Sequence, residues 1–167
     1  YNPEKNNVIW VCHALTANSD VFDWWPQLFG FNGFFNPDEH FIVCANVIGS
    51  AYGSTGPLTP LKNRRPLLDH FPFISIKDMV NAHEVLRKHL KIEKIHTIIG
   101  ASLGGQQVLE WNIQSPELFE HTILIATNAR HSAYGIAFNE SQRLALYTDP
   151  TFGDGTLHGG RAGLIAA

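Results

Sequence analysis

The stretch His-Thr-Ile-Ile-Gly-Ala-Ser-Leu-Gly-Gly-Gln-Gln-Val-Leu-Glu-Trp, residues 96–111, places one serine among three glycines. An apolar run ends at Gly100, Ser102 follows, Gly104 and Gly105 come next, and a helical pattern begins. The sequence Gly-x-Ser-x-Gly between a strand and a helix is typical of a sharp turn that lifts a nucleophilic serine above a sheet. Glycine is needed because side chains at the flanking positions would collide with neighbouring backbone. The stretch therefore predicts that Ser102 is a nucleophile.

A phosphate-binding loop is the alternative interpretation of the same glycines. It is disfavoured because the chain has neither a Gly-Lys-Ser/Thr sequence nor a G-x-G-x-x-G pattern. A plain tight turn is the other alternative. Against both, Ser102 stands at the start of a predicted helix, where the helix dipole favours a developing negative charge.

The composition is that of one globular domain: 167 residues, 44% hydrophobic and 16% charged. The net charge of -3 gives no reason to expect a nucleic acid or a membrane surface as partner, and the basic group at 62–65 is expected to be a solvated loop. No apolar run reaches the roughly 18 to 20 residues that span a bilayer. The chain begins Tyr-Asn-Pro-Glu, without Met and without a signal-peptide pattern, so we expect its start to be internal to a longer product.

Two cysteines, Cys12 and Cys44, lie at or near the ends of predicted strands. We expect two reduced, buried thiols in a cytoplasmic protein. A disulfide or a metal-binding pair is the alternative, without a C-x-x-C pattern to support it. The nine histidines show no metal-ligand spacing either, so no metal is expected.

The order of the predicted elements indicates an α/β fold with a mostly parallel sheet and flanking helices. Short apolar runs without alternation suit strands buried on both faces, and they occur at 8–12, 41–45, 96–99 and 122–126. Helical spacing occurs at 75–90, 106–114 and 136–147, with Ser75 as a plausible N-cap. Long loops follow the first two strands, and loops at the carboxyl ends of parallel strands are where such sheets bind ligands.

A serine nucleophile needs two N–H donors for the oxyanion, a general base and an orienting carboxylate. In this arrangement one donor is the backbone N–H after the nucleophile, here Leu103, and the other lies in the loop after an earlier strand. That loop is His-Ala-Leu-Thr, residues 13–16, and we assign the second donor to Leu15. His13 is a candidate base, but its place in the oxyanion loop favours a structural role.

The acid and the base of the triad are expected after later strands, in the order Ser, Asp or Glu, His. No clear strand pattern follows residue 126. Asp149, Asp154 and His158 lie in a Gly-rich segment without a preceding strand, so we expect none of them to complete the triad. We expect the chain to be a fragment that stops before the acid and the base and is inactive alone.

Several segments together resemble the homoserine O-acetyltransferase family. They are His-Ala-Leu-Thr at 13–16, Cys-Ala-Asn-Val-Ile-Gly at 44–49, Tyr-Gly-Ser-Thr-Gly-Pro at 52–57, the serine turn with Leu-Glu-Trp at 109–111, and Ile-Ala-Phe-Asn-Glu-Ser-Gln-Arg at 136–143. They occur in the family's order and cover nearly the whole chain. The blocks at 52–57 and 136–143 are far more specific than the serine turn.

The resemblance implies an α/β-hydrolase fold, with residues 1–135 as the N-terminal part of the core and 136–167 as the start of a helical lid insertion. It implies ping-pong transfer of an acetyl group from acetyl-CoA, as co-substrate, to the hydroxyl of L-homoserine in methionine synthesis, without a cofactor. It assigns Ser102 as nucleophile and Leu15 and Leu103 as oxyanion donors, and places Arg143 in a structural or pocket-lining role. It further implies a cytoplasmic homodimer.

Other functions remain open on the same residues. Relatives within the family use succinyl-CoA or act on serine, and the scaffold also supports a carboxylic ester hydrolase, in which water takes the acyl group. A third possibility is a non-catalytic structural or binding piece, since the acid and base are not found.

Overall fold

The computed structural model describes residues 3–4, 6–60, 66–156 and 158–167, so the basic group at 62–65 lies outside the described residues. The chain divides into two compact units. The first comprises Tyr1–Gly56 and Phe73–Ala129, and the second Pro57–Pro72 and Arg130–Ala167. The predicted boundary between residues 135 and 136 stays a prediction.

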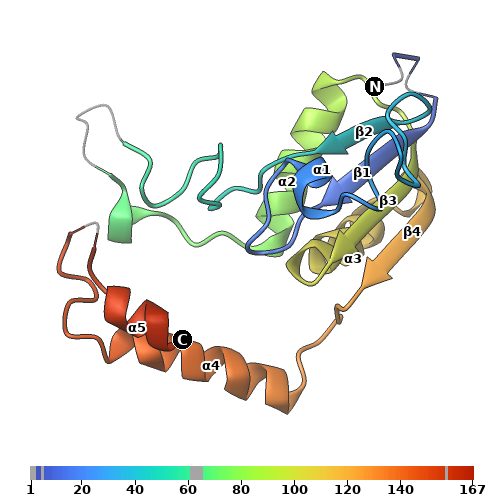
Figure 1. The fold of residues 1–167 in the computed structure, drawn as a ribbon. Coiled ribbons are helices and arrows are strands. Elements are labelled where there is room, and N and C mark those ends of the chain that lie inside the picture. The colour runs from blue at the N-terminus through green and yellow to red at the C-terminus, as the bar shows by residue number, and fades with distance from the viewer. Residues whose placement is uncertain (1–2, 5, 61–65, 157) are drawn as a thin grey trace. The chain divides into compact units, whose positions relative to one another are not determined.

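The first unit is built on a parallel four-stranded sheet in the order β2-β1-β3-β4 (Figure 1). Its strands are β1 (Val8–Cys12), β2 (Phe41–Cys44), β3 (Ile95–Ala101) and β4 (Phe119–Ile125). All four predicted strands are confirmed, although β3 and β4 begin earlier than the apolar runs suggested. The start of β4 was missed because a short 3-10 turn, η2 (Pro116–Leu118), leads directly into it.

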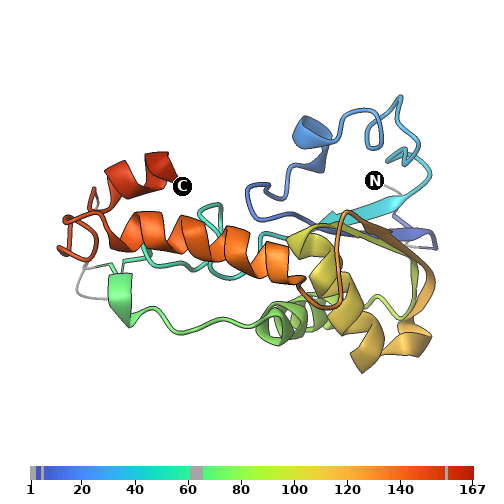
Figure 2. The same ribbon diagram turned by 90° about the horizontal axis from the view of Figure 1, so that it is seen from below.

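The central strand β1 is buried on both faces, and alternate residues enter two different cores. Val8, Trp10 and Cys12 belong to a cluster with residues of α2 (Ile76–His89) and α3 (Leu103–Gln114). Ile9 and Val11 join a second cluster with α1 (Val21–Trp24) and the aromatic loop that follows it. Figure 2 shows α1 on one side of the sheet and α2 and α3 on the other.

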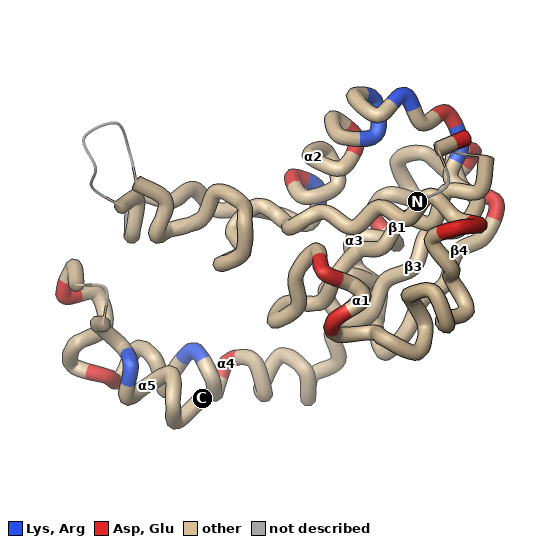
Figure 3. Tube along the Cα trace, turned by 45° about the horizontal axis from the view of Figure 1, so that its top comes forward, with Lys and Arg blue, Asp and Glu red and all other residues tan. Residues whose placement is uncertain are grey.

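Helix α2 begins where the sequence predicts, because Ser75 forms a capping box with Asp78. The Ser75 hydroxyl accepts a hydrogen bond from the Asp78 N–H, and the Asp78 carboxylate accepts one from the Ser75 N–H. The Ser75 hydroxyl also donates to the Asp78 carboxylate, and this bond, together with the one from the Ser75 N–H, holds the pKa of Asp78 below its usual value. Charged residues of both signs lie along this helix (Figure 3), as expected of a solvated outer face.

Strand β4 departs from the expected burial on both faces. Ile123, Leu124 and Ile125 are 36%, 42% and 38% exposed. The reason is its place at one end of the strand order, where it pairs with β3 alone among the described residues. An apolar run therefore predicted the strand correctly but not how far it is covered.

The second unit contains α4 (Ala133–Tyr147), α5 (Arg161–Ala166) and a 3-10 turn, η1 (Leu68–His70). Helix α4 begins three residues before the predicted start, because Ser132 caps it by accepting a hydrogen bond from the Gly135 N–H. Helix α5 packs closely on α4 at Gly163, where a Cβ would lie 2.4 Å from the Ala145 carbonyl oxygen. Across the described residues, no helix is long and apolar enough to cross a membrane.

Candidate active site

The candidate site lies where the connections of the sheet change direction. Strand β1 is followed by a loop and α1, β3 is followed by α3, and these helices cover opposite faces. Strands β1 and β3 are paired neighbours, with Cys12 opposite Gly100. Ligands of parallel α/β sheets bind at such a switch point, beyond the carboxyl ends of the strands.

Ser102 occupies the tight turn between β3 and α3, as the sequence predicts. Its backbone has φ 53° and ψ −119°, a conformation that side-chain-bearing residues rarely adopt. The end of β4 holds it there: the Ser102 N–H donates to the Ile125 carbonyl at 3.0 Å, and the Thr127 hydroxyl donates to the Ser102 carbonyl at 2.9 Å. The Ser102 side chain is exposed and caps no helix N–H. Local strain of this kind is maintained at functional sites, and it leaves the hydroxyl available for chemistry.

Gly100 and Gly104, on either side of Ser102, are required by close backbone contacts. A Cβ on Gly100 would lie 2.4 Å from the Gly104 carbonyl oxygen, and one on Gly104 would lie 1.9 Å from the Cys12 carbonyl oxygen. A Cβ on Gly105 would meet the Thr127 side chain at 2.5 Å. The first turn of α3 therefore sits directly against the end of β1, which brings Ser102 beside the loop that follows β1.

The two predicted oxyanion donors are the backbone N–H groups of Leu103 and Leu15. Leu103 is the first residue of α3, so its N–H has no partner within the helix. Leu15 lies in the exposed loop after β1. Neither N–H is hydrogen-bonded to another residue in the described part of the chain. Both N–H groups are therefore free to donate a hydrogen bond.

His13 is fully buried and both of its ring nitrogens are engaged. Nε2 accepts a hydrogen bond from the Val47 N–H at 3.1 Å, so Nδ1 carries the proton and donates to the Ala14 carbonyl at 2.8 Å. A base for Ser102 needs a free, accessible nitrogen. The structure thus supports the predicted structural role of His13 and not the alternative role of base.

A family model described as alpha/beta hydrolase fold matches residues 7–162. The chain belongs to the α/β-hydrolase fold family. In this fold family a serine in a strand–turn–helix of this kind, called an elbow, is the nucleophile, and the loop after an earlier strand supplies the second oxyanion donor, so these roles stay predictions for Ser102 and Leu15. The strand–elbow–helix arrangement and the free N–H groups described above agree with that assignment.

The chain is also similar to individual proteins within this fold family. The chain is 47% identical over 167 residues to a homoserine O-acetyltransferase of Cyclobacterium marinum, covering 99% of this chain and 48% of that protein. Among solved structures, a homoserine O-acetyltransferase from Staphylococcus aureus superposes with a TM-score of 0.72 at 32% identity, covering 90% of this chain and 45% of that one. The acetyl esterase MekB superposes with a TM-score of 0.79 at 28% identity, covering 99% and 48%. The chain spans about half the length of the curated relatives it matches.

The acidic residues that follow Ser102 in the second unit have structural partners. The Asp149 carboxylate accepts hydrogen bonds from the Gly163 N–H, the Thr151 N–H and the Thr151 hydroxyl, which lower its pKa. Asp154 accepts one from the Thr156 N–H, and the Thr156 contacts likewise lower its pKa. These bonds shape the turn that leads into α5, in agreement with the expectation that neither residue serves a triad.

Arg143 lies on α4 and pairs with Glu140 one turn earlier, with Nη2 2.6 Å from Oε2 and both side chains half exposed. This contact is an ordinary helix-surface ion pair. A role in lining the substrate pocket stays a prediction, because Arg143 belongs to the second unit and Ser102 to the first.

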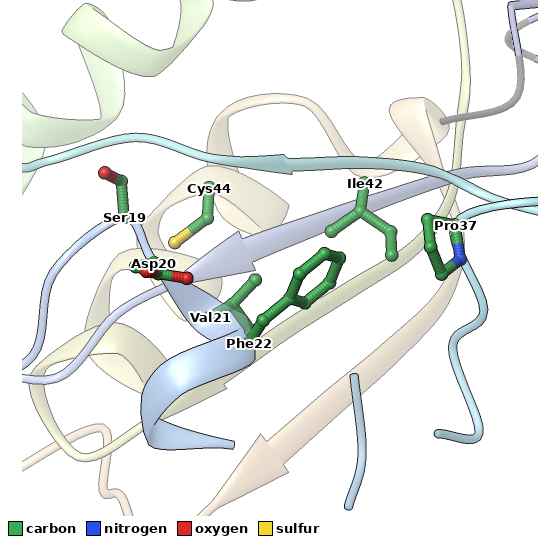
Figure 4. Close-up of a pocket in the computed structure, with 7 residues that line it drawn as sticks. All are labelled: Ser19, Asp20, Val21, Phe22, Pro37, Ile42 and Cys44. Atoms are coloured by element: carbon green, nitrogen blue, oxygen red, sulfur yellow. The ribbon is translucent and has the colours of Figure 1, made fainter. Parts of the chain in front are cut away.

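A separate cavity of about 390 Å³ lies between α1 and β2 (Figure 4). Its described lining residues are Ser19, Asp20, Val21, Phe22, Pro37, Ile42 and Cys44. Both cysteines are free thiols, and burial raises the pKa of Cys44 to about 12. The Cys44 thiol is therefore protonated at neutral pH and is not a second nucleophile.

One group that sequence spacing did not indicate is His96, Glu120 and His121. Their ligand atoms all lie within 4.8 Å of one another, although residues 96 and 120 are far apart in the chain. They belong to the N-terminal parts of β3 and β4. Ser102 follows the opposite end of β3, so this group takes no part in chemistry at the elbow.

Proposed function

We propose that this chain carries the nucleophile and the oxyanion donors of a homoserine O-acetyltransferase. The observation that carries the proposal is the strained elbow at Ser102, whose hydroxyl is exposed and caps no helix N–H. The elbow supports acyl transfer through serine, and the 47% identical relative named homoserine O-acetyltransferase supports the choice of substrates. The proposal includes the cytoplasmic location expected from the reduced thiols.

In the first half-reaction the Ser102 oxygen attacks the thioester carbonyl of acetyl-CoA. The carbonyl oxygen becomes an oxyanion, to which Leu15 and Leu103 donate hydrogen bonds. The C–S bond then breaks, CoA leaves as the thiol with the serine proton, and an acetyl ester remains on Ser102. No metal or redox cofactor enters these steps.

In the second half-reaction the homoserine hydroxyl attacks the acetyl ester. The same two donors hold the second oxyanion, Ser102 regains its proton, and O-acetylhomoserine leaves. The general base and its orienting carboxylate are assigned to residues outside this chain, since the relatives are about twice as long. Arg143 is proposed to line the pocket, and a homodimer is proposed from the family resemblance.

The proposal is tested by the intact mass of the full-length protein after brief mixing with acetyl-CoA alone. We expect the mass of one acetyl group on Ser102, removed when L-homoserine is added, and no gain in Ser102→Ala. A gain with succinyl-CoA instead would change the donor, and removal by L-serine would change the acceptor. The absence of acylation with either donor would refute acyl transfer through Ser102.

An ester hydrolase is the second candidate, favoured by the structural similarity to the acetyl esterase MekB. Both functions use the same acyl-enzyme and differ in whether homoserine or water removes the acetyl group. The ratio of O-acetylhomoserine to acetate, measured as homoserine is increased, separates them. Acetate release that does not depend on homoserine would identify the hydrolase.

A further inference from the structure

We propose that the Gln107 side chain is a positioning residue for both oxyanion donors, held in the required orientation by His83. This inference rests on the proposed function in that Ser102 must form an acyl-enzyme and Leu15 and Leu103 must donate to its oxyanion. It assigns a role to two buried polar residues, 0% and 3% exposed, that take no direct part in acyl transfer.

The Gln107 amide nitrogen joins the two sides of the oxyanion site. Nε2 lies 3.4 Å from the His13 carbonyl oxygen and 3.3 Å from the Leu103 carbonyl oxygen. Both distances are long for N–H···O bonds, and the two N–H groups of the amide provide one donor for each carbonyl. Residues 13 and 103 lie on different elements, so Gln107 is a polar link between the loop after β1 and the start of α3.

Each of these carbonyls lies next to the peptide group that donates to the oxyanion. The His13 carbonyl precedes the Ala14–Leu15 peptide by one residue, and the Leu103 carbonyl follows the Leu103 N–H within the same residue. Fixing a carbonyl fixes its whole peptide plane, since the peptide bond is planar. Only the φ and ψ of one residue, Ala14 on one side and Leu103 on the other, then separate each fixed plane from the plane of a donor. The direction of each donor N–H is therefore closely restricted.

The ring of His13 completes this restraint on the Leu15 side. Nδ1–H donates to the Ala14 carbonyl, which belongs to the same peptide plane as the Leu15 N–H. Nε2 is held by the Val47 N–H from the loop after β2. The direction of the Leu15 N–H is thus restrained in two ways. The His13 ring holds the Ala14 carbonyl, and Gln107 holds the His13 carbonyl.

His83 fixes which way the Gln107 carboxamide points. Because the amide N–H₂ faces two carbonyl acceptors, Oε1 faces His83, whose Nε2 lies 2.9 Å away and must carry the proton. The His83 ring stacks on Trp111 at 10° and meets Trp10 edge-on. Burial lowers the pKa of His83, so the ring is a neutral Nε2–H tautomer at neutral pH.

The test compares variants of the full-length protein by the rate at which Ser102 is acylated. The Gln107→Met variant keeps the shape of the side chain and removes its amide. Loss of a whole oxyanion donor costs about 10²–10³-fold in rate, and a misdirected donor costs less. We expect acylation by acetyl-CoA to slow about 10- to 100-fold, with the dissociation constant of CoA unchanged.

A matched control separates positioning from mere stability. Val108 is adjacent on α3, fully buried, and packs in the core cluster with α2 and β1. Val108→Ala is expected to lower the melting temperature while leaving the acylation rate of the folded protein unchanged. If Gln107→Met behaves in the same way, the positioning role is wrong.

His83 supplies a second, independent set of variants. His83→Phe keeps a ring beside Trp111 without a donor, and His83→Gln restores an N–H donor. We expect acylation to slow in the first and to recover in the second, and the double variant with Gln107→Met to be no slower than Gln107→Met alone. Additive effects would contradict a shared network.

Acylation by p-nitrophenyl acetate shows whether the positioning role or the proposed function is wrong. The burst of p-nitrophenol reports attack by Ser102 whatever the acceptor of the acyl group. A wild-type burst without transfer to homoserine would overturn the proposed function alone. Equal burst rates in the wild type, Gln107→Met and His83→Phe would overturn the positioning role alone.

Discussion

Helices α3 and α4 begin alike but differ in what surrounds them. Each starts directly after a serine and has glycine in its first turn. Five residues of α3 are buried, whereas α4 has no buried residue among those described. The comparison teaches that the same local signals, a serine and a glycine at a helix start, accompany a strained and tightly packed turn in one place and an ordinary helix cap in the other.

Gly104 in α3 and Gly135 in α4 differ in how much room surrounds them. A Cβ on Gly104 would lie 1.9 Å from a backbone oxygen of β1, which cannot move without shifting the central strand. A Cβ on Gly135 would lie 3.3 Å from the His131 side chain, which can give way. One glycine is therefore fixed by packing and the other is optional.

The largest effect is expected from the buried face of α3. Trp111→Ala removes a fully buried ring that contacts Trp10, His83 and Phe119, and should lower the free energy of unfolding by about 3–5 kcal/mol. Phe138→Ala on α4, where the side chain is 52% exposed, should cost less than about 0.5 kcal/mol. Urea denaturation of the full-length protein measures both. A comparable loss of unfolding free energy in Phe138→Ala would contradict this difference between the helices and show that the Phe138 side chain is buried in the full-length protein.

The glycine pair gives the next largest effect. Gly104→Ala should lower stability by about 1–3 kcal/mol and, by moving α3 from the Cys12 carbonyl, reduce acylation of Ser102 at least about 100-fold. Gly135→Ala should instead raise stability by up to about 1 kcal/mol, because alanine loses less backbone entropy in a helix. Thermal melts and the p-nitrophenyl acetate burst measure the two. A tolerated Gly104→Ala would mean that the elbow does not need this contact.

The serines that precede the two helices, Ser102 and Ser132, are expected to show the smallest changes in stability. Ser132→Ala should cost about 1 kcal/mol, because the hydroxyl caps α4. Ser102→Ala should change stability by less than about 0.5 kcal/mol, since its hydroxyl caps nothing, yet lower turnover by about 10⁴–10⁶-fold. Melting temperature and turnover are measured on the same samples. A large stability loss in Ser102→Ala would indicate that the serine is structural.

The elbow was predictable because its causes are local. Strand, glycines, serine and helix follow one another within residues 95–114, and the steric need for glycine acts over a few residues. The assignment of Leu15 as a donor came from the pattern of this fold and stays a prediction, although the pairing of β1 with β3 places the loops that follow them at the same edge of the sheet. The four strands and the helix starting after Ser75 were likewise local signals.

The contacts among residues far apart in sequence were not predictable. That His83 meets Gln107, and that Gln107 meets the His13 carbonyl, depends on the register with which α2 and α3 pack on the sheet. The residue pattern within a single segment does not determine that register. The short helices α1 and α5 were missed for a related reason: four and six residues are too few for helical periodicity to be seen.

The position of β1 at the centre of the sheet has a consequence for synthesis on the ribosome. Its partner β2 follows soon after, but its other neighbour, β3, is made only after the ribosome has added the residues between Cys12 and Gly100. At about 5–20 residues per second that interval lasts on the order of 5–20 s. Throughout it, a nascent chain carries an apolar strand with one unpaired edge, the kind of surface that invites mispairing or a chaperone.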